Sequence, residues 1–344
     1  MFLGIEIGGT KLQFGVGPGD SGSLTDVKRL AVEPKLGAEG IRRQLEEVGV
    51  CLIRQHGIRA VGIGFGGPVD AAAGRTITSH QIDGWDDFPL ANWCREQLGL
   101  PVVVANDSDS AGLAEARFGA GQGHRAVLYT NVGSGIGGAL VIEGEIYRGG
   151  SGTAIEPGHL RPGLQSDRPD QTVESIASGW AITAAVRERM ADPMSQPLRS
   201  LIDESRPRGA ESVRRRLIER EEADEKDAAD LRRKCEGQLD RLSTKIIAQA
   251  AEDGNQLARD VFDRACQAYG WAIAQVITLT APNIVVVGGG VSLAGEKLFF
   301  APLRRYVDRY GFPPRLGTFK IVPAQLGEEV VVHGALALAS KLAQ

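Results

Sequence analysis

The chain has 344 residues, of which 42% are hydrophobic and 24% charged, with a formal net charge of −4. This length accommodates two domains, and the composition is that of a globular rather than a disordered protein. The negative net charge gives no general attraction to nucleic acid, so we expect no nucleic-acid partner. No run approaches the length of a membrane span, and no basic segment precedes an apolar core at the amino terminus. We therefore expect a cytoplasmic protein with no membrane partner.

The four cysteines are widely separated along the chain, at Cys51, Cys94, Cys235 and Cys266. No two of them have the spacing of a metal site or a redox motif. Isolated cysteines of this kind are usually free thiols, so we expect no structural disulfide.

A glycine turn joins the first two apolar segments, residues 2–7 and 12–16. The pattern predicts two strands of a hairpin, with the turn formed by Gly8-Gly9-Thr10-Lys11. Because glycine has no Cβ, the backbone N–H groups of such a turn can approach a phosphate, and Thr10 and Lys11 add a hydroxyl and a cation. A plain glycine hairpin without a ligand is the commoner outcome and stays open.

An amphipathic helix is predicted for residues 36–55, followed by a strand over residues 60–65. That strand ends at Gly66 and Gly67, where a ligand can lie against bare backbone.

Three consecutive valines, residues 102–104, predict a buried strand, and the small residues after Asp107 predict the start of a helix. Asn106 and Asp107 therefore lie at the carboxyl end of a strand, where open α/β sheets bind ligands. A carboxylate there can accept a proton from a bound hydroxyl, while the neighbouring amide orients the same ligand. On this segment alone, simple capping of the helix by Asp107 is an equally good interpretation.

The strand, glycine turn, strand pattern recurs over residues 126–142, with Gly133-Ser134-Gly135 in the turn. The repetition predicts two related domains that face one phosphate chain. It is not a Walker motif, because no Gly-Lys-Ser/Thr occurs and no helix follows immediately.

Three polar residues follow the second glycine turn: Glu156 and His159 in a loop, and Glu174 at the start of a helix. Such residues are usually solvated, or placed at a helix start for its dipole. The position of Glu156 and His159 just beyond the glycine turn favours ligand binding.

From about residue 190 to residue 240 the sequence is rich in Arg and Glu and poor in aromatic residues. The interleaved charges predict a solvated helical excursion from the surface rather than an anion-binding patch or a separate domain.

Helical periodicity resumes over residues 242–251 and 257–281, before a strand over residues 284–287. This strand leads into Gly288-Gly289-Gly290, which could receive a flat adenine and ribose. The alanine-rich final helix, residues 332–342, could pack closely against an earlier element.

Together these motifs resemble the ROK family of sugar kinases and repressors, within the actin-like ATPase superfamily. The resemblance covers nearly the whole chain, in segments 4–11, 66–70, 106–107, 133–138, 156–159, 174–179 and 286–291. It implies an α/β fold with two actin-like (ribonuclease H-like) ATPase domains and an active-site cleft between them. The smaller domain would comprise residues 1–120 and about 328–344, and the larger residues 121–327.

The resemblance also implies a role for each motif. Asp107 would be the base that takes a proton from a sugar hydroxyl. The sugar contacts would be Gly67, Asn106, Glu156, His159 and Glu174. The phosphates of ATP would lie against Gly8, Gly9, Thr10, Lys11, Gly133, Ser134 and Gly135, and the nucleoside beside Gly288, Gly289 and Gly290. Glu6 would lie beside the magnesium ion.

The sequence departs from the family pattern in several places. Glu6 stands where most relatives carry Asp beside the metal, which keeps a carboxylate but changes its reach. Gln81 replaces the Asn often found four residues before Trp85, and His80 beside it could alter sugar selectivity. The cysteine-rich zinc motif of the family is absent, so we expect no zinc. No helix-turn-helix segment precedes residue 1, which argues against the repressor branch.

We therefore expect a hexose kinase that uses ATP and Mg²⁺ and forms a homodimer. Two alternatives stay open. Residues 106–121 are also similar to polyphosphate glucokinases, which would make inorganic polyphosphate the donor. A catalytically silent sugar-binding regulator is the other, although the intact Thr10, Lys11 and Ser134 speak against it. The sugar stays open among glucose, fructose, mannose and N-acetylated hexosamines.

Overall fold

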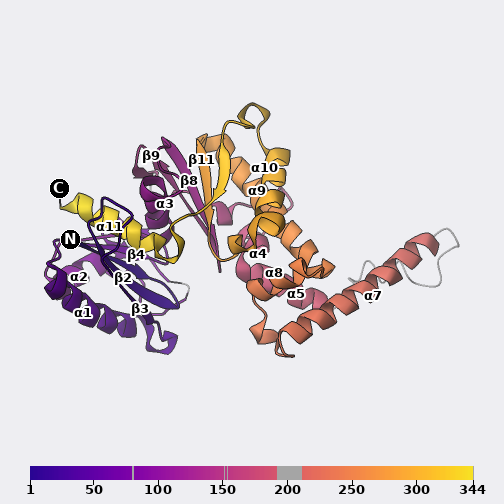
Figure 1. The fold of residues 1–344 in the computed structure, drawn as a ribbon, viewed down its shortest axis with the longest axis horizontal. Coiled ribbons are helices and arrows are strands. Elements are labelled where there is room, and N and C mark those ends of the chain that lie inside the picture. Colours follow the sequence, from indigo (N-terminus) through magenta and orange to yellow (C-terminus); the bar gives the residue numbers. More distant parts are fainter. Residues whose placement is uncertain (80, 151, 153, 192–210, 344) are drawn as a thin grey trace.

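The computed structural model describes residues 1–79, 81–150, 152, 154–191 and 211–343, with the side chains of residues 211–222 left aside. His80 therefore lies outside the described residues. Two five-stranded sheets and one two-stranded hairpin form the β structure, and helices surround both sheets (Figure 1). The expected α/β class is confirmed, with two sheets of equal size.

The first sheet has the strand order β3-β2-β1-β4-β7. Its strands are β1 (Phe2–Ile7), β2 (Lys11–Gly17), β3 (Asp26–Ala31), β4 (Val61–Phe65) and β7 (Val102–Asn106). The first three strands run antiparallel, whereas β4 and β7 run parallel to β1. Every residue of β1 and β4 is buried, which explains why their sequences are apolar except for Glu6.

The second sheet repeats this arrangement with the order β10-β9-β8-β11-β12. Its strands are β8 (Ala126–Val132), β9 (Ile136–Ile142), β10 (Glu145–Tyr147), β11 (Ile284–Gly288) and β12 (Lys320–Pro323). Again three antiparallel strands are followed by two that run parallel to the central one. The repetition predicted from the two glycine turns therefore extends over both sheets.

Two helices lie between the sheets: α3 (Asp107–Phe118) and α11 (Val330–Leu342). α11 packs against β1, β4 and α3, while α3 also packs against β8 and β9. Figure 1 shows α11, in yellow, beside the indigo strands of the first sheet, so the two termini lie at the same end of the molecule. These two helices therefore connect the halves of the protein.

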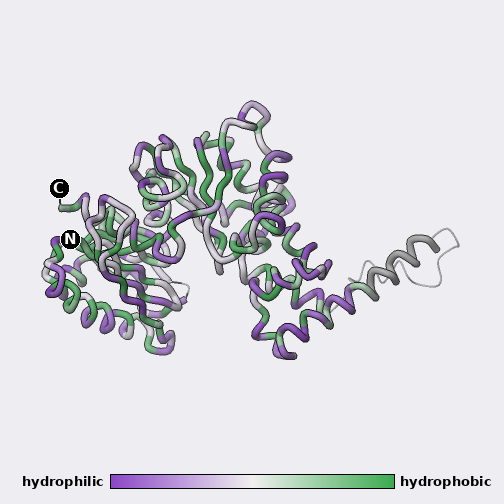
Figure 2. Tube along the Cα trace, viewed as in Figure 1, coloured by the Kyte–Doolittle hydropathy of each residue, from purple (hydrophilic) through white to green (hydrophobic). Residues whose placement is uncertain are grey.

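The remaining elements lie outside the two sheets, and α7 projects away from them (Figure 1). The helices are α1 (Gly37–His56), α2 (Leu90–Leu98), α4 (Glu174–Ala177), α5 (Gly179–Ala191), α7 (Glu211–Lys234), α8 (Thr244–Glu252), α9 (Gln256–Thr280) and α10 (Ala301–Tyr310), and the small hairpin is β5 (Val69–Asp70) with β6 (Arg75–Thr76). Single 3-10 or π turns occur at Pro34–Leu36, Pro157–His159, Leu239–Arg241, Ser292–Ala294, Glu296–Phe300, Pro313–Arg315 and Gly327–Glu329. Figure 2 shows hydrophobic residues on the strands and mixed polarity along outer helices such as α1. In the described part of the chain no helix is long and apolar enough to cross a membrane.

Of the charged segment predicted as a surface excursion, residues 192–210 lie outside the described residues, and the described part differs from the prediction at its C-terminal end. α7 is helical and projects from the body as expected (Figure 1). However, Ala228, Leu231 and Cys235 are buried in the same core as α5, α8 and α9. The sequence prediction missed these few apolar residues because the segment around them is dominated by alternating Arg and Glu. Cys94 and Cys266 are buried as well, Cys51 is exposed, and all four cysteines are free thiols.

The Leu231→Ala variant tests whether this end of α7 belongs to the core. Leu231 is 0% exposed, so its truncation should lower the free energy of unfolding by about 2–5 kcal/mol. The matched control is Leu239→Ala, because Leu239 is 39% exposed and its truncation should cost much less. Equal thermal midpoints for the two variants would show that α7 contributes no core packing.

Candidate active site

The two glycine turns and the end of β7 line one cavity of about 780 Å³. Ten of the predicted site residues line it: Thr10, Gly67, Asn106, Asp107, Gly133, Ser134, Gly135, Glu156, His159 and Glu174. Residues that were predicted for the site but lie outside this lining are Glu6, Gly8, Gly9, Lys11 and Gly288 to Gly290. The cleft therefore unites the predicted sugar contacts with parts of both phosphate loops.

Asn106 fixes the junction between β7 and α3. Its Oδ1 accepts hydrogen bonds from the backbone N–H groups of Ser108 at 2.8 Å and Asp109 at 3.3 Å, which caps the helix. Its Nδ2 donates to the carbonyl of Gly67 at 3.0 Å, since Asn106 pairs with Phe65 in the neighbouring strand. The capping role weighed for Asp107 thus belongs to Asn106, and Asp107 is released to face the cavity.

Asp107 is the first residue of α3 and is partly exposed to the cavity. Its Oδ1 accepts hydrogen bonds from the backbone N–H of Ser108 at 2.7 Å and from the Ser108 hydroxyl at 3.4 Å. Burial raises the pKa of Asp107, while these hydrogen bonds act in the opposite direction. A carboxylate with a raised pKa is a stronger base than a solvated one, which suits proton abstraction.

Glu156 precedes the turn Pro157–His159 and His159 ends it, and both residues line the cavity. Withdrawal from solvent raises the pKa of Glu156, the nearby His159 lowers it, and Asp107 and Glu174 raise it further. Several carboxylates therefore converge on one cleft, where they can accept hydrogen bonds from the hydroxyl groups of a polyol.

Glu174 serves the second glycine turn directly. Its Oε2 accepts a hydrogen bond from the backbone N–H of Ile136 at 2.7 Å. A Cβ added to Gly135 would lie 2.7 Å from the same oxygen, so this approach needs glycine at that position. One oxygen of Glu174 is thus committed to the loop, while the other accepts no hydrogen bond from the described residues and is available to a ligand.

The first glycine turn carries an ion pair at its base. Lys11 Nζ lies 3.2 Å from Glu6 Oε1, whereas Glu6 Oε2 is buried without a hydrogen-bond partner in the described chain. Glu6 is only 8% exposed, and burial raises its pKa to about 7 although Lys11 lowers it. A cation near Oε2 would favour the ionised form. One carboxylate combined with phosphate oxygens is a usual arrangement for Mg²⁺ in kinases, so Glu6 fits that role.

The third glycine segment lies next to the second one. Asn131 of β8 pairs with Gly288 of β11, and the N–H of Val291 donates to the carbonyl of Val132 at 2.9 Å. Gly289 has a φ of +88°, and a Cβ there would lie 2.4 Å from that carbonyl. This tight turn leaves Gly290 exposed with open space around its Cα.

Three lining residues received no site role in the sequence interpretation or only a doubtful one. Gln81 lines the cavity and lies so close to Gly9 that any Cβ there would overlap its amide. Asn131 follows Thr130 near the end of a largely apolar strand, and Trp180, at 52% exposure, directly follows a predicted motif. Two polar residues at the end of a buried strand were the one available signal, and they did not single out Asn131.

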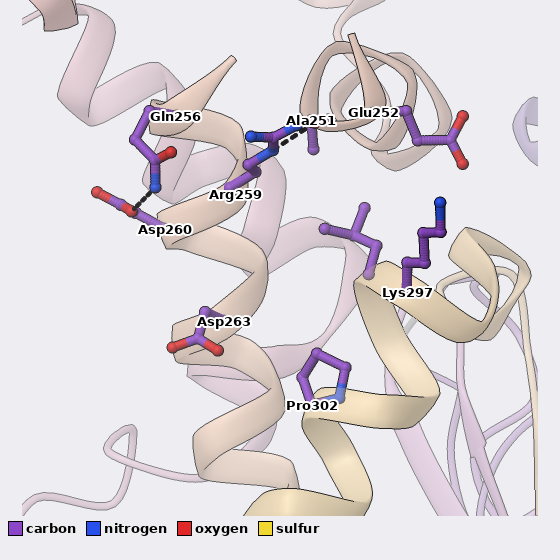
Figure 3. Close-up of a pocket in the computed structure, with 9 residues that line it drawn as sticks. Ala251, Glu252, Gln256, Arg259, Asp260, Asp263, Lys297 and Pro302 are labelled. Carbon is purple, nitrogen blue, oxygen red and sulfur yellow. Dashed lines mark hydrogen bonds between the residues drawn. The ribbon is translucent and has the colours of Figure 1, made fainter. Parts of the chain in front are cut away.

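A second cavity, of about 650 Å³, lies between α8, α9 and the segment that leads into α10 (Figure 3). Two of its polar side chains are hydrogen-bonded within the lining. Arg259 Nε donates to the Ala251 carbonyl at 2.7 Å, and Gln256 Nε2 donates to Asp260 Oδ1 at 2.8 Å. None of the predicted site residues lines it, so the cleft between the sheets is the better candidate.

The loop that bears His159 is held by protein contacts. The N–H of Val173 donates to the carbonyl of Leu160 at 2.8 Å, and Arg168 Nε donates to Asp170 Oδ1 at 3.0 Å. Within the residues described, no group of three or more His, Cys, Asp or Glu side chains could hold a metal ion. Both Arg168 and Asp170 are exposed, so the backbone bond next to buried Val173 does most of the bracing.

We therefore predict that the purified protein contains no stoichiometric zinc. Its activity should return fully after treatment with a strong chelator once magnesium is replenished. Metal analysis by mass spectrometry, combined with activity before and after chelation, checks this. Stoichiometric zinc whose removal inactivates the protein irreversibly would contradict it.

Comparison with known proteins agrees with this geometry. The sequence model of the ROK family matches residues 2–342. The chain is 28% identical to a glucokinase from Thermotoga maritima over 342 residues, which covers 98% of this chain and 96% of the relative. A ROK family glucokinase from Streptomyces griseus, solved in complex with glucose and AMPPNP, superposes with a TM-score of 0.76 at 31% identity over 99% of both chains. A ROK hexokinase from Thermus thermophilus superposes with a TM-score of 0.73 at 26% identity, covering 98% of this chain and 97% of that one. The chain belongs to the ROK family.

Proposed function

We propose that this protein is a hexose kinase that transfers the γ-phosphoryl group of ATP to a sugar hydroxyl. The observation that carries the proposal is the position of Asp107 in a cavity that residues of both glycine turns also line. A base for the sugar hydroxyl and groups suited to phosphates thus share one cleft. The glucokinase names of the relatives support glucose as the first sugar to test.

On the donor side, phosphoryl transfer depends mainly on positioning and on neutralisation of charge. The N–H groups of the turns at Gly8–Lys11 and Gly133–Gly135 would bind the phosphate oxygens, with the hydroxyls of Thr10 and Ser134 beside them. Gly290 would leave room for the nucleoside. Mg²⁺, held by Glu6 and the phosphates, would supply further neutralisation of negative charge.

On the acceptor side, Glu156, His159 and Glu174 would bind and orient the sugar hydroxyls, and Gly67 would leave space for the ring. Asn106 uses its oxygen for the helix cap and one N–H for Gly67, so its second amide hydrogen is the one available to the sugar. Asp107 would then accept the proton of the attacking hydroxyl. Closure of the two halves around both substrates would exclude water and limit hydrolysis of ATP.

A coupled assay over a sugar panel, run with ATP and with inorganic polyphosphate, tests this function. We expect turnover of at least one hexose with ATP and Mg²⁺. Turnover with polyphosphate alone would identify the alternative donor. Sugar binding by calorimetry without turnover with either donor would identify a silent regulator.

We also propose, as the family resemblance implies, that the protein is cytoplasmic and forms a homodimer. Sedimentation of the purified protein should then give twice the chain mass of 36.6 kDa. For the domain boundaries we propose residues 1–120 with about 328–344, and residues 121–327. The packing of α11 against β1 and β4 supports the return of the C-terminal segment to the first domain.

Lys11→Ala should weaken donor binding more than sugar binding. The variant loses a cation near the phosphates, and it also leaves Glu6 without the charge that lowers its pKa. Calorimetry with a nonhydrolysable ATP analogue and, separately, with the sugar measures the two effects. Lys35→Ala, at an exposed site in another turn, is the control. A larger loss of sugar affinity than of nucleotide affinity would place Lys11 outside the phosphate site.

A further inference from the structure

A hydrogen-bonded bridge joins the base Asp107 to the second glycine turn. The Ser108 hydroxyl lies 3.4 Å from Asp107 Oδ1 and 3.3 Å from Asn131 Oδ1. Asn131 Oδ1 also accepts a hydrogen bond from the N–H of Gly137 at 2.9 Å. The side chains of Ser108 on α3 and Asn131 on β8 therefore connect the part of the cleft proposed for the sugar to the part proposed for the ATP phosphates.

The packing around this bridge leaves no space for another side chain. A Cβ at Gly137 would lie 2.3 Å from the Ser108 hydroxyl and 2.9 Å from Asn131 Oδ1. Ser108 is itself only 5% exposed. Glycine at residue 137 thus allows α3 to rest directly on the turn, and the bridge fixes the distance between them.

The side-chain amide of Asn131 also has N–H donors that make no hydrogen bond within the described chain. Within the described chain its Nδ2 donates to no protein group, and the residue lines the cavity beside Gly133 and Ser134. An amide has two N–H donors at this position. The free amide is therefore available to an oxygen of the donor phosphate.

From these contacts, and resting on the proposed kinase function, we propose that Asn131 is a positioning residue that holds the donor loop in register with Asp107 through Ser108. The Ser108 hydroxyl has one hydrogen and two acceptors within reach. With Asp107 ionised, the hydroxyl divides its hydrogen between Asp107 and Asn131. Once Asp107 has taken the sugar proton on its other oxygen, Oδ1 becomes a weaker acceptor, and the hydroxyl donates to Asn131. The bridge thus adapts to both states of the base without movement of the loop.

The charged and titratable groups around Asp107 come from several elements and would all influence its titration: Glu6 on β1, Asp109 on α3, Tyr129 on β8, and Glu156 in the loop after β10. The variants proposed below leave all of these in place. A change in the pH profile therefore reports on the bridge itself.

The test compares Asn131→Ala, Ser108→Ala and the double variant with the wild type. Asn131→Ala should raise the KM for ATP about 3- to 10-fold, as expected for the loss of one hydrogen bond, and should lower kcat. The affinity for sugar alone should stay unchanged. Asn283→Ala is the matched control, because the exposed Asn283 also accepts one backbone hydrogen bond, from Ala126 at 3.0 Å.

The acidic limb of the kcat/KM profile separates positioning from general damage to the fold. Ser108→Ala removes a donor that lowers the pKa of Asp107, so the limb should move to higher pH. Asn131→Ala leaves the hydroxyl hydrogen wholly to Asp107, so the limb should move to lower pH, by about half a unit in each case. The acidic limb of the double variant should move as that of Ser108→Ala does, because Asn131 affects the pKa of Asp107 only through Ser108.

Three outcomes would overturn the proposal while leaving the kinase assignment intact. In each of them the wild type is active. The KM for ATP is unchanged in Asn131→Ala, or Asn283→Ala changes KM and kcat as much as Asn131→Ala does, or the acidic limbs of Ser108→Ala and Asn131→Ala move in the same direction. An inactive wild type with every sugar and both donors would instead overturn the proposed function. Thermal unfolding of each variant confirms that the comparison is made between folded proteins.

Discussion

Asp107→Asn is expected to lower kcat by about 10²- to 10⁴-fold, the usual worth of general base catalysis, with little change in sugar affinity. The asparagine keeps an oxygen for the N–H of Ser108, which lies 2.7 Å from Oδ1, so the start of α3 should hold its shape. It cannot accept the proton of the sugar hydroxyl. Burial raises the pKa of Asp107, and the wild-type rate should therefore fall as the pH drops through that pKa and the carboxyl is protonated.

Steady-state kinetics and sugar calorimetry over a range of pH measure these effects. The variant should lose the acidic limb along with the rate, because the group that titrates has been removed. Asp109→Asn makes the same chemical change two residues further along α3, at a side chain outside the cavity lining, and should lower kcat less than tenfold. Turnover close to the wild type in Asp107→Asn would remove Asp107 from its role as base.

Local patterns were enough to predict the central strands of both sheets and the centre of the cleft, but the edge strands β3, β10 and β12 were missed. The valine run before Asn106 and the apolar segments on either side of each glycine turn specify strands, since these strands are buried and their sequences are continuous. Helix limits were also close: residues 257–281 were expected and α9 spans Gln256–Thr280. Periodicity of this kind depends on near neighbours in the chain, which a sequence displays directly.

Contacts between distant segments could not be predicted in the same way. The cap of α3 by Asn106 and its bond to Gly67 depend on the pairing of β7 with β4, and the bridge through Asn131 depends on how α3 meets β8. Neither leaves a regular spacing in the sequence. The buried end of α7 was missed for a related reason, because Leu231 acquires its surroundings only when α5, α8 and α9 assemble.

The C-terminal helix shows how strongly such a contact can constrain a residue. α11 passes so close to α3 that a Cβ at Gly334 would lie 1.8 Å from the backbone oxygen of Ser110. On its other side, a Cβ at Gly62 of β4 would lie 1.9 Å from the oxygen of Ala335. In both places the obstacle is backbone rather than a flexible side chain. α11 is thus fixed between the first sheet and the helix that begins with Asp107.

Gly334→Ala is therefore expected to lower the free energy of unfolding by about 3 kcal/mol or more, at or above the upper end of ordinary overpacking. Helix propensity alone would favour alanine by about 1 kcal/mol, so a destabilised variant shows that the contact with Ser110 outweighs the propensity. Denaturant unfolding measures the effect, and Gly22→Ala is the control, because its added Cβ would meet only Phe118 at an ordinary 3.5 Å. Because α3 must shift to make room, kcat should fall even under conditions where the variant is folded. A Gly334→Ala protein as stable and as active as the control would mean that α11 and α3 lie further apart than the structure has them.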